Sequence, residues 1–112
     1  MNTPTVSDSY DMVVRILLHF HPPVHRIGYK QLCCAISRFA QDPTQSLSKD
    51  LYPYIAEQMG YSDWRAIEIA IRSVITDAWK NGNREAWTYY FPGLTCAPSN
   101  KRFIATLAEY IK

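Results

Sequence analysis

Long hydrophobic runs are absent from this 112-residue chain, and so is a large excess of charge of either sign. A membrane-spanning helix needs about 20 consecutive apolar residues, and no stretch of the chain approaches that length. The N-terminal sequence MNTPTVSDSYD has neither the basic start nor the apolar segment of a secretory signal. We therefore expect a cytoplasmic protein that does not contact a membrane.

Several hallmarks of enzymes and metal proteins are also missing. The sequence contains no nucleophile elbow, no Gly-rich phosphate loop and no paired carboxylates at a useful helical spacing. Its histidines and its three cysteines match no standard zinc-binding spacing. The adjacent Cys33 and Cys34 are poorly placed to bond to each other, because the geometry is strained. The sequence therefore predicts no catalytic activity, no metal and no cofactor.

Apolar residues make up 47% of the chain, which is enough for one folded domain of this length. They recur at three- and four-residue steps in six segments, and no segment shows the alternation typical of a strand. We therefore predict an all-α domain over residues 8–112, after a disordered segment at residues 1–7. The six expected helices cover residues 8–20, 29–41, 48–59, 63–80, 84–90 and 99–111.

Residues 47–82 have the form of a helix-turn-helix, in which a short helix and a Gly60 turn precede a longer helix. We expect Ser62 to cap the longer helix and Gly82 to end it in a left-handed conformation. Its apolar stripe comprises Trp64, Ile67, Ile71, Val74, Ile75 and Ala78, and its opposite face carries Arg65, Ile69, Arg72, Ser73 and Thr76. Such a helix can enter a DNA major groove, although antiparallel helix pairs without a DNA role share this outline.

The formal net charge is only +2, so a nucleic-acid role would have to rest on local basic patches. One stretch fits this requirement, because residues 12–41 contain no Asp or Glu. Its basic and titratable side chains are Arg15, Arg26, Lys30, Arg38, His19, His21 and His25. Two interpretations stay open, namely a solvated surface whose acidic partners lie on other helices, or a surface that faces DNA phosphates.

Four segments of the sequence resemble one protein family. They read HPPVHRIGYKQL at 21–32, LYPYIAEQMG at 51–60, IEIAIRSVITDAWKNGN at 67–83 and APSNKRFIA at 97–105. In this order they resemble the C-terminal DNA-binding effector domain of the sporulation master response regulator, the stage-zero sporulation protein A family. The resemblance covers about residues 17–111.

The resemblance implies a compact six-helix domain in which the third and fourth helices form the helix-turn-helix. It also implies sequence-specific reading of a GC-flanked site in double-stranded DNA, as a tandem dimer, and transcription control through the RNA polymerase sigma subunit. Residue by residue, Glu68 and Arg72 match positions that family members use at base edges. His25, Gly28 and Tyr29 match a turn whose surroundings touch the DNA backbone.

The sequence departs from the family in three respects. Ile69 stands where the family usually has Arg, and Ser73 stands where it usually has His, which changes the expected site preference. The 91–98 stretch is a few residues shorter than in the family, near the place to which sigma contacts are attributed. We also see no room in the sequence for a phosphate-receiving domain, and therefore do not expect phosphorylation to switch this chain in the family manner.

We therefore predict a DNA-binding transcription regulator whose helix at about 63–80 enters the major groove. The expected base contacts are Arg65, Glu68, Ile69, Arg72 and Ser73, and the expected phosphate contacts are His25, Arg26, Lys30 and Thr76. The alternative is a protein–protein interaction module that kept the fold, lost the reading face and modulates a sporulation or transcription regulator. The exposed apolar Ile69 and the low net charge favour this alternative, whereas Arg65, Arg72 and the acid-free stretch favour DNA.

Overall fold

Six α-helices make up the described part of the chain, residues 6–111, in the computed structural model. They are α1 (Val6–Leu18), α2 (Ile27–Gln41), α3 (Tyr52–Met59), α4 (Arg65–Asn81), α5 (Arg84–Tyr90) and α6 (Asn100–Glu109). A π-helical turn (Leu47–Leu51) directly precedes α3. No strand occurs within residues 6–111, and the expected all-α class is confirmed.

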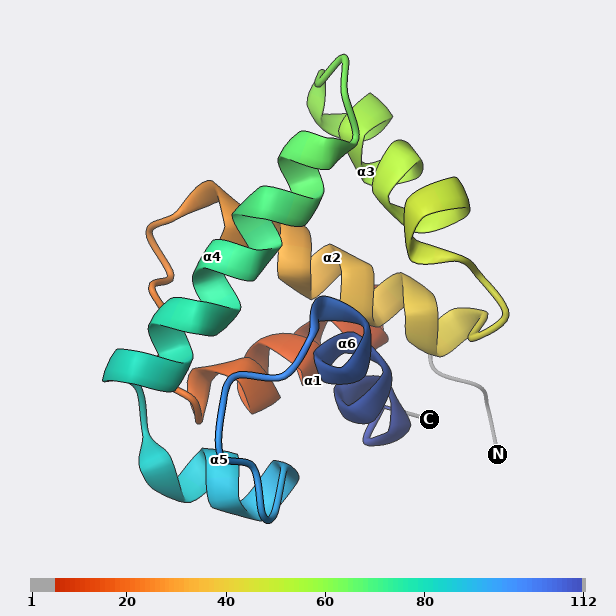
Figure 1. Cartoon of the computed structure of the whole chain (residues 1–112). Coiled ribbons are helices and arrows are strands. Elements are labelled where there is room, and N and C mark those ends of the chain that lie inside the picture. Colours follow the sequence, from red (N-terminus) through yellow and green to blue (C-terminus); the bar gives the residue numbers. More distant parts are fainter. Residues whose placement is uncertain (1–5, 112) are drawn as a thin grey trace, which may run out of the picture.

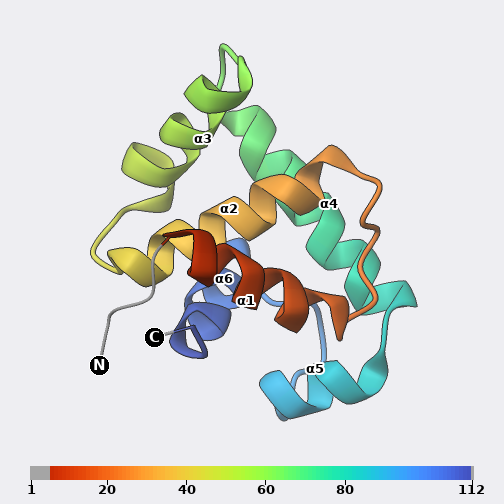
Figure 2. The same ribbon diagram turned by 180° about the vertical axis from the view of Figure 1, so that it is seen from behind.

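Helix α2 lies at the centre of the molecule, where it contacts α1, α3, α4 and α6. In Figure 1, α4 and α6 lie in front of α2, α3 meets the start of α4, and α5 follows the other end of α4. Helix α1 covers the opposite side of α2 (Figure 2). Helix α4 packs on α2, α3 and α6 through one face, and Ile69 and Ser73 on its outer face remain exposed.

The buried stripe of α4 agrees with the helical period of the sequence. Its members are at most 3% exposed, and they are Ile67, Ile71, Val74, Ile75 and Ala78. Burying an aliphatic side chain of this size stabilises a fold by about 1.5–3 kcal/mol. Trp64, expected in the same stripe, is only half-buried and stacks on Tyr52 of α3 with 6.0 Å between the ring centroids. Packing on the body of the domain therefore fixes α4 along its length.

An aromatic cluster secures the far end of α4. Trp87 of α5 packs against Phe20, Phe91 and Phe103 with ring centroids 4.8–5.5 Å away. The Trp87 indole N–H also donates a hydrogen bond to the carbonyl oxygen of Ala78, at 3.0 Å. These contacts hold α5 against the last turn of α4.

The ends of α4 differ from those expected from the sequence. The helix begins at Arg65, after Trp64, which makes no side-chain capping hydrogen bond. The carboxylate of Asp63, and not Ser62, accepts a hydrogen bond from the Arg65 backbone N–H at 2.9 Å. Gly82 follows α4 in an extended conformation, with φ of −89°, so the expected left-handed conformation is wrong. A left-handed glycine instead ends α3, where Gly60 has φ of 77°. Only glycine adopts this conformation without a steric cost.

Two further segments refine the expected helices. Residues 1–5 of the segment expected to be disordered lie outside the described residues, whereas α1 already begins at Val6. The helix expected at 48–59 is divided into the π-helical turn and α3. This division places Pro53 in the first turn of α3, a position that tolerates proline.

Candidate nucleic-acid interface

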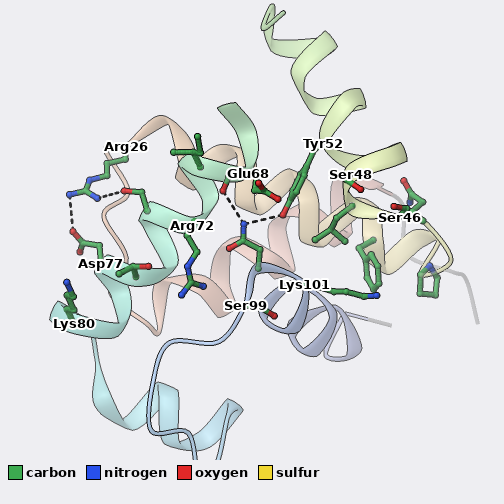
Figure 3. A pocket seen from close by; sticks show the side chains of 18 of the residues that line it. Arg26, Ser46, Ser48, Tyr52, Glu68, Arg72, Asp77, Lys80, Ser99 and Lys101 are labelled. Carbon is green, nitrogen blue, oxygen red and sulfur yellow. Dashed lines mark hydrogen bonds and ion pairs between the residues drawn. The ribbon is translucent and has the colours of Figure 1, made fainter. Parts of the chain in front are cut away.

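The outer face of α4 lines an open groove of about 1410 Å³ (Figure 3). Residues 43–48, between α2 and α3, and residues 99–101, at the start of α6, also line it. The residues that α4 contributes are Glu68, Ile69, Arg72, Ser73, Thr76, Asp77, Lys80 and Asn81. Most of them follow each other at three- or four-residue steps, which places their side chains on one side of a helix.

Four of the five expected base contacts line this groove, namely Glu68, Ile69, Arg72 and Ser73. Ile69 is 69% exposed, as expected from its position opposite the buried stripe. Arg65 does not line the groove. Its Nε lies 3.3 Å from Oδ1 of Asp63, at the first residue of α4. The hydrogen bond from the Arg65 backbone N–H holds the pKa of Asp63 below its usual value.

The expected phosphate contacts divide into two pairs. Arg26 and Thr76 line the groove, whereas His25 and Lys30 are exposed but outside it. Arg26 Nη1 donates a hydrogen bond to Ser73 Oγ at 3.0 Å, and Arg26 Nη2 lies 3.0 Å from Asp77 Oδ2 (Figure 3). The side chains of this ion pair are 43% and 25% exposed, so it contributes at most about 1 kcal/mol to stability. Arg26 nevertheless connects the α1–α2 loop to the outer face of α4.

A close approach of two backbones supports this connection. Gly28, in the first turn of α2, is buried against α4, and a Cβ atom there would lie 2.3 Å from the carbonyl oxygen of Ala70. Any side chain at this position would therefore push α2 away from α4. The glycine explains how the α1–α2 loop comes near enough for Arg26 to contact Ser73 and Asp77.

Positive charge is concentrated along the groove. Its basic side chains are Arg26, Arg72, Lys80 and Lys101, and its acidic side chains are Glu68 and Asp77. This local excess of two positive charges equals the formal net charge of the whole chain, +2. An open groove with such an excess attracts a polyanion.

The sequence did not predict the side of the groove formed by the start of α6. The side-chain amide of Asn100 donates hydrogen bonds to the Glu68 carbonyl oxygen at 3.1 Å and to the Tyr52 hydroxyl at 3.2 Å. Arg72 Nη1 donates a hydrogen bond to the carbonyl oxygen of Pro98. Burial raises the pKa of Tyr52, so its hydroxyl stays protonated at neutral pH. Pro98 and Asn100 belong to the segment APSNKRFIA, but the sequence does not show which helices these two residues contact.

The comparison with known families decides the identity of this fold. Residues 13–111 match the sequence model of the family described as Sporulation initiation factor Spo0A C terminal. The chain belongs to this family. The match covers α2–α6 completely, so the resemblance seen in the sequence is confirmed. The Spo0A C-terminal family is a DNA-binding, transcription-regulating family and not an enzyme family.

The groove lies on the part of the fold that the resemblance to the Spo0A C-terminal family associates with a helix-turn-helix. Helix α3, the Gly60 turn and α4 correspond to the expected helix-turn-helix, and the groove runs along the outer face of its second helix. Within residues 6–111, no three His, Cys, Asp or Glu side chains are grouped to hold a metal ion. No helix in this part of the chain has the length and apolar character needed to cross a bilayer.

The cysteines lie apart from the groove and are free thiols. Cys33 is buried, Cys34 is partly buried and Cys96 is exposed. Burial raises the pKa of the Cys33 thiol to about 11, so it is protonated and unreactive at neutral pH. Cys33 therefore behaves as a small apolar core residue.

Proposed function

We propose that this Spo0A C-terminal domain regulates transcription by sequence-specific binding to double-stranded DNA, with α4 in the major groove. The observation that carries the proposal is the outer face of α4, which presents Glu68, Ile69, Arg72 and Ser73 in one open, positively charged groove. Helix α4 has 17 residues, and a major groove about 12 Å wide admits an α-helix. Family membership supports a DNA-binding role for the domain as a whole.

Arg72 is the proposed guanine-reading residue. A guanidinium carries five N–H donors, and the hydrogen bond to Pro98 engages the Nη1 atom alone. The remaining donors suffice for a bidentate contact with guanine O6 and N7, which is worth about 1–3 kcal/mol of discrimination. Glu68, one turn earlier on the same face, is suited to accept a hydrogen bond from a cytosine amine. Ile69 between them offers an apolar contact for a thymine methyl group.

Phosphate contacts would flank this reading face. In the free protein, Arg26 pairs with Asp77, so binding would exchange a carboxylate for a phosphate oxygen. His25 is exposed on the same loop, and Lys30 is exposed on the first turn of α2. Thr76 and Lys80 lie further along α4. Such contacts position the protein on DNA without reading the sequence.

The proposal is tested by fluorescence anisotropy with two duplexes, one carrying the GC-flanked site that the resemblance implies and one with the same bases scrambled. We expect the wild type to prefer the site. Arg72→Ala should lose about 1–3 kcal/mol of this preference, whereas Arg15→Ala, an exposed arginine on α1, should keep it. A wild-type protein that binds neither duplex at low salt would contradict the proposal.

A second candidate function is supported by Ile69. An apolar side chain that is 69% exposed in the middle of the groove also suits a protein-interaction face. In this case both duplexes would fail to bind, and the domain would act through a protein partner of the transcription machinery. The expected sigma-subunit contact and the tandem dimer on DNA stay predictions, and sedimentation with one-site and two-site duplexes tests the second of them.

A further inference from the structure

We propose that Asn100 is a positioning residue for DNA reading, because its side-chain amide holds α4 at a fixed angle to α3 and α6. This inference rests on the proposed function, since the consequence of the fixed angle is site preference. Asn100 itself lies at the first residue of α6. Its proposed role is to act through Glu68 and Arg72 and not through a direct base contact.

The contacts of Asn100 connect three helices. Its Nδ2 lies 3.1 Å from the Glu68 carbonyl oxygen on α4 and 3.2 Å from the Tyr52 hydroxyl on α3. Both hydrogen bonds are visible as dashed lines that end at Glu68 and Tyr52 in Figure 3. One amide group therefore joins α6 to both helices of the helix-turn-helix, which the Gly60 turn links in sequence.

The groups at both ends of this connection are held by packing and by a helix cap. Tyr52 is 1% exposed and stacks on Trp64, so its hydroxyl is held in place by packing. Ser99, immediately before Asn100, caps α6 by accepting a hydrogen bond from the Arg102 backbone N–H at 3.1 Å. The amide of Asn100 is thus fixed by a capped backbone on one side and a buried phenol on the other.

The same short segment also holds the proposed guanine-reading side chain. The carbonyl oxygen of Pro98, which is buried, accepts the hydrogen bond from Arg72 Nη1. Glu68 and Arg72 are one helical turn apart, so residues 98–100 hold the backbone at one reading position and the side chain at the other. Loss of the Asn100 contacts should loosen both positions together, because the Pro98 carbonyl moves with the segment.

The test compares Asn100→Ala and Tyr52→Phe with the wild type, and Gln58→Ala serves as a matched control. Gln58 is an exposed amide on α3 that does not line the groove. Affinity for the site duplex and for the scrambled duplex is measured by anisotropy, and amide hydrogen exchange is followed over residues 65–72 and over α2. Tyr52→Phe removes one hydrogen bond and keeps the ring, so it reports on the connection even if Asn100→Ala folds poorly.

We expect Asn100→Ala to weaken site binding about tenfold, equivalent to about 1.4 kcal/mol, and to leave the scrambled duplex and the salt dependence unchanged. Exchange should become faster over residues 65–72 and stay unchanged in α2. Tyr52→Phe should have a smaller effect in the same direction, and Gln58→Ala should match the wild type.

Wild-type site preference and wild-type exchange in Asn100→Ala would overturn the proposal. Equal losses on both duplexes, with faster exchange in α2 as well, would also overturn it, because they indicate general destabilisation. A wild-type protein without site preference refutes the proposed function. The exchange data then test separately whether Asn100 holds α4 in place. Faster exchange confined to residues 65–72 would support the positioning role, and unchanged exchange would exclude it.

Discussion

Replacement of Ile69 by Arg separates a DNA-reading face from a protein-binding one. Ile69 is 69% exposed, so roughly a third of it is buried. Full burial of an isoleucine stabilises by about 1.5–3 kcal/mol, and the buried third therefore contributes roughly 0.5–1 kcal/mol. An arginine recovers much of this through its aliphatic stem and its higher helix propensity. We expect the free energy of unfolding to change by no more than about 0.5 kcal/mol.

The same replacement should tighten DNA binding. The new guanidinium would lie three residues before Arg72 on the face that lines the groove. A bidentate contact with guanine is worth about 1–3 kcal/mol, which corresponds to roughly 5- to 150-fold tighter binding to the GC-flanked site. Anisotropy with the site and scrambled duplexes measures this gain. Leu18→Arg, at a 47% exposed position of α1, controls for the added charge.

Three results would refute this reasoning in different ways. A large fall in the melting temperature of Ile69→Arg would show that Ile69 is buried and that the helical register is wrong. Unchanged stability with no gain on the site duplex would count against DNA reading by α4. An equal gain on both duplexes, matched by Leu18→Arg, would show that added positive charge alone explains the effect.

Arg26→Ala should weaken binding to all duplexes and flatten the slope of log affinity against log salt by about 0.9, because the phosphate contact that replaces Asp77 on binding is lost; an unchanged slope would show that Arg26 makes no phosphate contact. Gly28→Ala should lower the free energy of unfolding by about 1–3 kcal/mol, because the added Cβ would lie 2.3 Å from a carbonyl oxygen of α4, and a wild-type urea midpoint would contradict this. At pH 8 an alkylating reagent should label Cys96 before Cys33, as mass spectrometry would show. Folding raises the pKa of the Cys33 thiol to about 11 from an ordinary value of 9.0. The free energy of unfolding should therefore fall as pH rises through this interval, because the unfolded chain releases the thiol proton first, and a pH-independent urea midpoint there would be the contrary result.

The sequence predicted α4 well because its helix is packed on one side. Apolar residues at helical spacing gave the register, and the structure places Ile71 and Ile75 in the core and Ile69 outside it. Helix ends were less predictable. Ser62 and Asp63 are both good capping residues, and their order in the sequence does not show which of them accepts the hydrogen bond. The π-helical turn before α3 was also missed, because apolar spacing does not distinguish it from the first turn of an α-helix.

The groove was predictable on one side only. The residues of α4 that line it follow from helical geometry, and the resemblance of four segments to the Spo0A C-terminal family pointed to the same helix. The other side depends on contacts between distant parts of the chain. Asn100 contacts Glu68, which lies 32 positions earlier in the sequence. Arg26, in the loop between α1 and α2, pairs with Asp77 on α4. Neither pairing leaves a periodic signal in the sequence, so only the folded structure reveals them.

The most direct test of DNA reading by α4 is an NMR titration of ¹⁵N-labelled protein with the site duplex. We expect the largest amide shift changes on residues 68–76 of α4 and on residues 25–30, and we expect the scrambled duplex to shift residues 68–73 much less. Shift changes concentrated on α1 or α5, or identical patterns with both duplexes, would contradict it.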